Sequence, residues 1–327
     1  MKRIIKPIPR DLLKTELTDD KFLRNTNFGN NKIYSVNYHN SPNVLREIGR
    51  LRELAFRSAG GGTGKELDID EYDTAEQPYQ QLIVWDPHKE EIVGGYRYIL
   101  CSNAMKDSDG NLMLATKRLF NFSEKFINEY LPYTIELGRS FVQPNYQSSL
   151  PDRSKIFALD NLWDGLGSLI IAYPNVKYFF GKVTMYTDFN RRARDMILFF
   201  LKEQFSDSDN LVTPIEPLQT ETPEEELKTI FVGKDYKENY KILLQNVRAL
   251  GENIPPLINS YMNLSPTMKV FGTSMNNHFG YVEETGILVT IDDIYEKKKE
   301  RHLNMIRLKN AWKKIKNIKA YPVKKSK

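Results

Sequence analysis

Residues that bind metals or form disulfide bonds are scarce in this sequence. Its 327 residues include one cysteine, Cys101, which cannot form an internal disulfide and therefore fits a reducing cytoplasm. Because Cys101 lies in an apolar stretch, a buried structural thiol is favoured over a reactive nucleophile. The four histidines lack the spacing of a zinc site: His39, His88, His278 and His302. We therefore expect no metal site and no bound cofactor.

Long apolar runs are also missing. The chain has no stretch of about 18 apolar residues and its mean hydropathy is -0.52, so we expect no membrane-spanning helix. Residues 1–9 contain neither an apolar core nor a small-residue cleavage site. We therefore expect no secretory signal and a cytoplasmic protein. P-loop and G-x-S-x-G patterns are absent too.

The chain nevertheless has enough apolar residues for a substantial core, with 40% hydrophobic and 12% aromatic residues. A chain of this length could hold two domains, but mixed α/β folds of this size are often single. Apolar periodicity predicts helices near 43–57, 154–172 and 188–204, and strands near 80–85, 91–101, 133–142, 176–186, 268–273 and 279–291. Ser41 is the expected N-cap of the first helix, with Pro42 at its first position. We expect a hairpin from the first two strands, and a right-handed parallel crossover across 133–186.

An ordered series of polar residues runs through the middle of the chain. It comprises Arg52-x-x-x-Phe56, then Asp68-x-Asp70-x-x-Asp73, then Arg97 within a strand, then Glu136-Leu-Gly-Arg139-Ser140. The predicted hairpin lies within this series, and the strand–helix–strand unit follows it. In this order, the chain resembles the N-acyltransferase branch of the GNAT superfamily over residues 43–292.

The resemblance is above all to the bacterial aminolipid N-acyltransferases that make ornithine and glycine lipids, and more distantly to the acyl-homoserine lactone synthases. The stretch Pro255-Pro256-Leu257-Ile258-Asn259-Ser260-Tyr261, followed by Val270-Phe271-Gly272, is also similar to the aminolipid enzymes. The resemblance implies an α/β (α+β) fold, a GNAT-like mixed central sheet flanked by helices. We expect one domain over residues 1–296, with a polar helical insertion at 206–250 and a basic tail at 297–327.

Glu136 is the candidate that handles the proton of the amine. The resemblance places it on a strand that splays away from its parallel neighbour and exposes backbone N–H groups. A carboxylate there could take the ammonium proton, and the N–H groups could bind the oxyanion. The alternative is a salt bridge to Arg139, which an extended strand disfavours because residues i and i+3 point to opposite faces unless a bulge intervenes. Glu136, Arg139 and Arg97 are the predicted catalytic residues.

Four further residues are predicted to bind the substrate. An arginine inside a sheet must be paired if it is buried, and Asp70 and Asp73 are the obvious partners of Arg97. The resemblance implies that this cluster shapes the amine pocket; a purely structural ion network is the alternative. Arg52 and Phe56 lie one turn apart on a helix that covers the acyl site in the family. A solvated charge at Arg52 and a plain core position at Phe56 remain open.

The segment before the helix near 154–172 should meet the arm of the acyl carrier. In acetyl-CoA members of the superfamily, a glycine-rich loop there presents N–H groups to the pyrophosphate. Residues 143–154 contain no glycine, which suits a lone phosphopantetheine phosphate better than CoA. The candidate phosphate-binding residues are Ser148, Ser149, Arg153 and Ser154; a polar loop with Ser154 as helix cap is the alternative. The expected co-substrate is an acyl thioester, carried by acyl carrier protein rather than CoA.

Charge is unevenly distributed along the chain. Residues 297–327 hold 13 of the 47 Lys and Arg residues but only one of the 42 acids, Glu300, so the remainder carries 34 bases against 41 acids. The tail also places apolar residues on one helical stripe: Met305, Leu308, Trp312 and Ile315. Such a helix can lie on an anionic membrane surface; a soluble coil and a helix packed on the body are the alternatives. No nucleic-acid-binding module accompanies the charge, so we expect no nucleic-acid partner.

The sequence therefore predicts an N-acyltransferase. It would move a long, 3-hydroxylated acyl chain from acyl carrier protein to the amine of a small amino acid such as glycine or ornithine, giving a lyso-aminolipid. One alternative is acyl-homoserine lactone synthesis, with S-adenosylmethionine as substrate, although the glycine-rich residues 60–64 stand where those synthases carry an aromatic residue. A second is a non-catalytic membrane-binding protein, since relatives are often labelled haemolysins. The chain has neither the span nor the pore-forming stretch that lysis needs.

Overall fold

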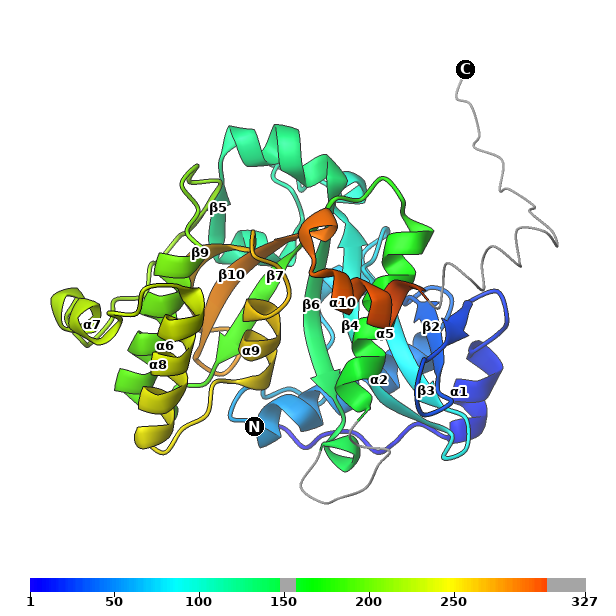
Figure 1. Ribbon diagram of the computed structural model, residues 1–327. Coiled ribbons are helices and arrows are strands. Elements are labelled where there is room, and N and C mark those ends of the chain that lie inside the picture. Colours follow the sequence, from blue (N-terminus) through cyan, green and yellow to red (C-terminus); the bar gives the residue numbers. More distant parts are fainter. Residues whose placement is uncertain (148–156, 305–327) are drawn as a thin grey trace.

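A computed structural model of the protein describes residues 1–147 and 157–304. Its largest element is an eight-stranded sheet in the order β1-β2-β3-β4-β6-β7-β10-β9 (Figure 1). These strands are β1 Phe22–Asn25, β2 Lys32–Val36, β3 Gln80–Asp86, β4 Glu91–Leu100, β6 Thr134–Val142, β7 Tyr178–Met185, β9 Lys269–Asn276 and β10 Val282–Thr290. Strands β6 and β7 are parallel, as predicted, and the other neighbours are antiparallel. The predicted mixed sheet is confirmed.

Helices pack on both faces of this sheet, which confirms the second part of the predicted architecture. They are α1 Arg10–Glu16, α2 Pro42–Ser58, α3 Glu71–Thr74, α5 Ala158–Ala172, α6 Arg191–Gln204, α7 Glu224–Ile230, α8 Tyr236–Ala249, α9 Pro256–Met262 and α10 Glu296–Lys299. Within the described ranges, none of them is long and apolar enough to cross a membrane.

The start of α2 agrees with the sequence in position but not in its capping group. Pro42 begins the helix as expected, yet the side chain of Ser41 makes no capping hydrogen bond. The carboxylate of Glu16, at the end of α1, accepts hydrogen bonds from the backbone N–H groups of Asn43 and Val44 at 3.1 and 2.9 Å. A negative group at this position also complements the helix dipole. The first helix of the chain is thereby tied to the second.

The two helical layers follow from the alternation of side chains along the strands. On one face, α1 and α2 pack against Ile83 and Trp85 of β3. On the other face, α5 packs against Leu82 and Val84, because successive residues of a strand point to opposite sides. Helices α6, α8 and α9 extend this second layer next to the β7–β10–β9 half (Figure 1). Arg97 on β4 and Glu136 and Arg139 on β6 therefore belong to a sheet that has helices packed on both of its faces.

Residues 206–250, expected to form a polar helical insertion, contain β8 (Val212–Pro214), α7 and α8. Strand β8 pairs with β5 (Phe120–Phe122) in a separate two-stranded sheet. Helix α8 packs against α6, and its Leu243 and Val247 are buried in the same core as α5 and α6. The segment shares the main core, and its status as an insertion into a single domain stays a prediction.

Candidate active site

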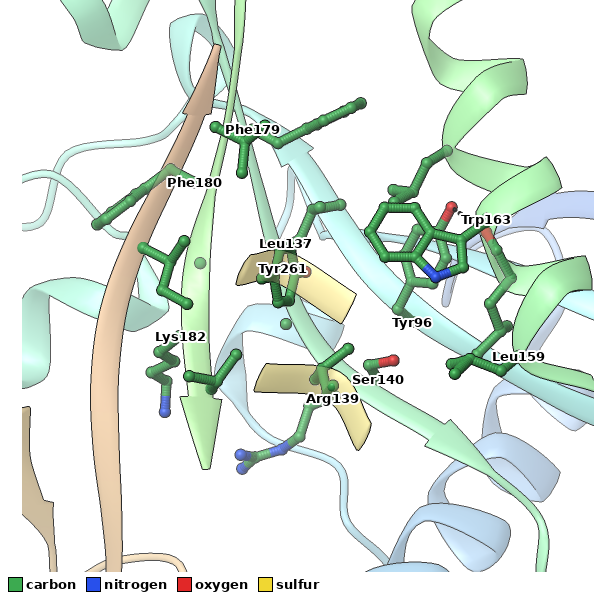
Figure 2. A pocket seen from close by; sticks show the side chains of 18 residues that line it. Tyr96, Leu137, Arg139, Ser140, Leu159, Trp163, Phe179, Phe180, Lys182 and Tyr261 are labelled. Atoms are coloured by element: carbon green, nitrogen blue, oxygen red, sulfur yellow. Dashed lines mark hydrogen bonds between the residues drawn. The ribbon is translucent and has the colours of Figure 1, made fainter. Parts of the chain in front are cut away.

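The sheet opens between its two parallel strands. Across the described residues, β6 and β7 pair at three positions only: Thr134 with Tyr178, Ile135 with Phe179, and Glu136 with Phe180. Beyond Glu136 the two strands diverge, as Figure 2 shows. On its other side, β6 pairs with β4, with an irregularity in register between Gly95 and Arg97. The opening thus frees the β7-facing edge of β6 immediately after Glu136.

The backbone of β6 is irregular at the same place. Arg139 has a φ of 52°, in the left-handed region that residues with a side chain seldom adopt. The side chains of Glu136 and Arg139 have different partners. A direct salt bridge between them, the alternative to a catalytic role for Glu136, is not formed: Arg139 pairs instead with Asp68, from Nε to Oδ2 over 2.9 Å.

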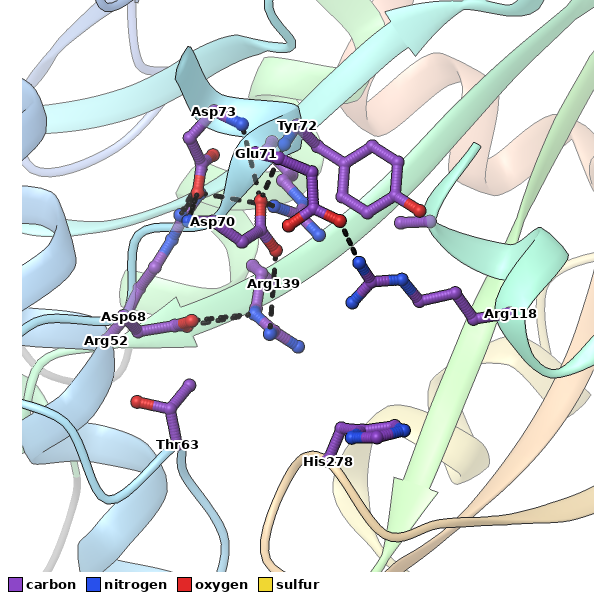
Figure 3. Close-up of polar contacts among 12 residues, drawn as sticks. Arg52, Thr63, Asp68, Asp70, Glu71, Tyr72, Asp73, Arg118, Arg139 and His278 are labelled. Carbon is purple, nitrogen blue, oxygen red and sulfur yellow. Dashed lines mark hydrogen bonds and ion pairs between the residues drawn. The ribbon is translucent and has the colours of Figure 1, made fainter. Parts of the chain in front are cut away.

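Three neighbouring cavities meet at the opening. An apolar one lies between β6, β7, α5 and α9 and is lined by residues such as Leu137, Trp163, Phe179, Leu257 and Tyr261 (Figure 2). A polar one of about 240 Å³ is lined by residues of the acidic loop before β3, together with Arg97, Arg118 and His278 (Figure 3). The third, called the central cavity below, has a volume of about 250 Å³ and is lined by residues that include Glu136 and Phe56. It shares residues with both of the other cavities. An apolar and a polar ligand can therefore approach the same point of the sheet.

Glu136 is held by three hydrogen bonds and is 1% exposed. Its Oε1 accepts from the hydroxyl of Tyr79 at 2.8 Å and the N–H of Ala115 at 3.1 Å, while Oε2 accepts from the hydroxyl of Thr116 at 2.6 Å. Burial raises the pKa of the Glu136 carboxyl, although the bonds from Thr116 and Tyr79 oppose the increase. A carboxylate accepts about four hydrogen bonds. Glu136 is thus fixed in place, more basic than an exposed glutamate, and able to accept one further proton donor.

Arg97 is paired as the sequence predicts. It is 3% exposed, and its Nη1 lies 2.7 Å from Oδ1 of Asp70 and 3.3 Å from Oδ2 of Asp73. Burial alone would raise the pKa of Asp70, but the charge and hydrogen bond of Arg97 hold that pKa well below its ordinary value. Asp70 also caps α3 by accepting from the N–H groups of Tyr72 and Asp73. The cluster therefore fixes the loop that forms one wall of the polar cavity.

Arg52 belongs to the same cluster, which rules out the alternative of a solvated helix charge. Its side chain is fully buried, and Nη1 lies 3.3 Å from each carboxylate oxygen of Asp73. A second guanidinium nitrogen donates to Oε1 of Gln81. Phe56, one turn further along α2, lines the central cavity and stacks edge-to-face on Phe279, with ring centroids 5.0 Å apart. The guanidinium of Arg139 lies 4.0 Å above the same Phe279 ring.

Other predicted residues lie outside the described part of the chain. These are the candidate phosphate-binding residues Ser148, Ser149, Arg153 and Ser154, and the tail stripe of Met305, Leu308, Trp312 and Ile315. Cys101 is buried as expected, and burial raises the pKa of its thiol. Within residues 1–147 and 157–304, no three His, Cys, Asp or Glu side chains gather as a metal site would need.

Several residues at the opening were not singled out from the sequence. Lys182 on β7 forms an ion pair with Glu284 on β10, and both line the central cavity. A lysine within the apolar stretch from Phe179 to Val183 is the same signal that pointed to Arg97, so it could have been noticed. Tyr79, in the loop before β3, and Thr116, in a short 3-10 helix, carry no comparable signal, because they acquire their role only through contact with Glu136.

The parallel strands that open beside a buried carboxylate define the class: a GNAT-type acyltransferase. A family model described as acetyltransferase (GNAT) domain matches residues 51–152. A protein of Bacteroides thetaiotaomicron named glycine N(alpha)-acyltransferase is 61% identical over 303 residues, covering 93% of this chain and 90% of its own length. One of Phocaeicola vulgatus with the same name is 58% identical over 303 residues, covering 93% of each chain. No solved structure matches.

The chain therefore belongs to the GNAT N-acyltransferase family that includes these two proteins, and it is an N-acyltransferase.

Proposed function

We propose that the protein transfers a long, 3-hydroxylated acyl chain from acyl carrier protein to the amine of glycine. The product is an N-acylglycine, a lyso-aminolipid. The observation that carries the proposal is the meeting of an apolar and a polar cavity at the opening after Glu136. The names of the two relatives favour glycine over ornithine as the acceptor.

The apolar cavity suits the acyl chain, because its walls are aromatic and aliphatic side chains such as Trp163, Phe179 and Tyr261. The polar cavity suits the amino acid, since a volume of about 240 Å³ favours a small ligand and its walls carry charges of both signs. The thioester carbonyl then lies at the opening, where the β7-facing edge of β6 can offer N–H groups to the developing oxyanion.

Glu136 is the proton acceptor of this reaction. It takes a proton from the glycine ammonium, directly or through water, and the free amine attacks the thioester carbonyl. A C–N bond forms, the C–S bond breaks, and the carrier thiolate leaves and takes up a proton. The raised pKa of Glu136 supports this role, because a more basic carboxylate removes an ammonium proton more readily.

The donor and the location are proposed from two segments of the sequence that extend beyond the described residues. The glycine-free segment 143–154 favours acyl carrier protein over CoA. The basic residues 297–327 would dock a cytoplasmic enzyme on the anionic inner face of the membrane, where an acylated amine is released.

A competition assay tests the acceptor and the reaction together. Purified protein is given one 3-hydroxyacyl carrier-protein thioester and equal amounts of glycine, alanine, ornithine and S-adenosylmethionine, and the products are identified by mass spectrometry. The proposal predicts N-acylglycine as the main product. A main product with another amine, or an acyl-homoserine lactone, would contradict it.

A further inference from the structure

Two residues line all three cavities at the opening: Arg139 on β6 and Lys182 on β7. They lie on the two strands that separate, and Figure 2 shows their charged ends at the same end of the opening. A ligand that extends from the apolar cavity to the polar cavity therefore lies against both residues. Their position alone makes them candidates for contact with the reacting molecules.

Both side chains retain hydrogen-bond donors after their ion pairs are formed. Arg139 directs Nε to Asp68, and its Nη2 lies 3.9 Å from Oδ2 of Asp70, an ion pair beyond hydrogen-bond distance. Among the described residues no hydrogen bond uses either of its Nη atoms. Lys182 pairs with Glu284, whose other oxygen accepts from Nδ2 of Asn276 at 3.0 Å. An ammonium group has three N–H donors, so Lys182 can bind a second partner while it keeps Glu284.

The positive charges of Arg139 and Lys182 act on each other across the cavity, although each also has an acidic partner, Asp68 and Glu284 respectively. Burial lowers the pKa of Lys182, Glu284 opposes this decrease, and the positive charges of Arg139 and Arg97 lower the pKa further. The cations therefore repel one another across the cavity, although Arg97 is already neutralised by Asp70 and Asp73. A bound anion would relieve the repulsion between Arg139 and Lys182.

We propose that Arg139 and Lys182 together bind the carboxylate of the acceptor amino acid and thereby select an α-amino acid over other amines. This inference rests on the proposed function, which supplies the zwitterionic acceptor. With the carboxylate held between β6 and β7, the ammonium end of the same small molecule can reach Glu136, which lines the same central cavity. The competing assignment for these donors is the oxyanion of the tetrahedral intermediate.

Glycine and glycinamide separate the two assignments, because glycinamide has the amine but no carboxylate. The experiment compares kcat and KM for both amines in the parent chain and in Lys182→Met, at a saturating acyl thioester. Since the two amines differ in basicity, the measured quantity is the change in their ratio of kcat/KM. We expect Lys182→Met to lower kcat/KM for glycine about 10- to 100-fold, mainly through KM, and to leave glycinamide nearly unchanged.

Three further variants keep the test decisive. Lys182→Met/Glu284→Gln removes both charges, so a fold disturbed by an unpaired Glu284 cannot imitate the effect; it should lose glycine preference in the same way. Lys182→Arg should restore part of that preference, because it restores the cation. Lys177→Met, at an exposed lysine just before β7, should change neither amine.

Equal losses for glycine and glycinamide in both the single and the double variant would overturn the inference, since an oxyanion or structural role affects both amines alike. A parent chain that acylates glycinamide but not glycine would overturn the proposed acceptor, and this outcome is visible before any variant is compared.

Discussion

Tyr79 donates the hydrogen of its hydroxyl to Oε1 of Glu136 over 2.8 Å, and both side chains are buried. Burial raises the pKa of the Tyr79 hydroxyl well above its usual value, so the group stays a donor throughout the physiological range. The bond crosses 57 positions of sequence and joins the residue just before β3 to the third residue of β6. It aligns the carboxylate next to the place where β6 and β7 separate.

The substitution Glu136→Gln should lower kcat by roughly 100-fold or more, because the amide cannot accept the ammonium proton. The fold should survive. The amide oxygen can keep the bonds from Tyr79 and Ala115, and the Thr116 hydroxyl can rotate to accept from the new NH₂ group. Single-turnover rates and thermal unfolding curves of the two proteins provide the measurement.

The parent rate should also depend on pH with a definite sign. Because the base is the ionised carboxylate, kcat/KM should rise with pH through a pKa above the usual glutamate value, in keeping with the effect of burial on Glu136. The Glu136→Gln protein should lack this acid limb. Near-native turnover in the variant would remove Glu136 from the mechanism.

The ion pairs around Arg97 should behave as one unit in unfolding experiments. Asp70→Asn or Arg97→Met alone removes one half of a largely buried ion pair and leaves the charges of the cluster unbalanced, so each should lower the free energy of unfolding by about 3–5 kcal/mol. The double substitution should cost far less than the sum, because neither charge is then left alone. Urea titrations of the parent, both single variants and the double variant measure this coupling.

An exposed pair on the same protein serves as the control for this cycle. Arg192 and Glu226 are in contact but 50% and 42% exposed, so their coupling should stay within about 1 kcal/mol. Additive effects at Asp70 and Arg97 would show that the two residues do not act as a network.

The fold was predictable from local pattern, whereas the site needed contacts between remote residues. The β3–β4 hairpin and the parallel β6–β7 pair were expected, because apolar periodicity and turn residues specify them locally. Helix α5 begins at Ala158 rather than near 154, and α6 begins at Arg191, where the side chain of Asn190 caps it. Strands β1 and β2, which extend the sheet beyond β3 at one side, were not predicted.

Among the site residues, the pairing of Arg97 with Asp70 and Asp73 was predicted from the sequence, because a buried arginine needs acidic partners nearby. The partner of Arg139 could not be found in this way. Asp68 lies 71 positions away, and the left-handed backbone of Arg139, which coincides with the irregular register between β4 and β6, has no local sequence signal. Lys182 was overlooked although the same argument applied to it.

The donor preference gives a separate test of the glycine-free segment 143–154. Acyl carrier protein should support a higher kcat/KM than the matching acyl-CoA, because the segment has no glycine-rich loop for the CoA pyrophosphate. Steady-state rates with the same acyl chain on both carriers measure the preference. An equal or better specificity constant for acyl-CoA would show that the segment serves another purpose.

The basic tail should bind anionic vesicles, since each Lys or Arg near such a surface contributes about 1 kcal/mol. Binding should weaken as salt rises. Removing residues 297–327 should release the protein while sparing turnover of dispersed substrates. That deletion also removes the contacts of Arg301 with Asp160 and of His302 with Asp164, so a chain ending at residue 304 is the better matched variant. Sedimentation with vesicles reports the bound fraction.

A full-length protein that ignores anionic vesicles would contradict the membrane role of the tail. Equal binding by the full chain and the chain ending at residue 304 would instead assign the membrane contact to the body.

Lipid extracts of cells that express the chain test the central claim most directly. Cells are fed isotope-labelled glycine, and extracts from cells with the parent protein, the Glu136→Gln protein and no added protein are compared by mass spectrometry. The account predicts a labelled N-(3-hydroxyacyl)glycine that accumulates with the parent and falls to background with Glu136→Gln. Extracts without labelled acylglycine, in cells that contain the folded parent protein, would contradict it.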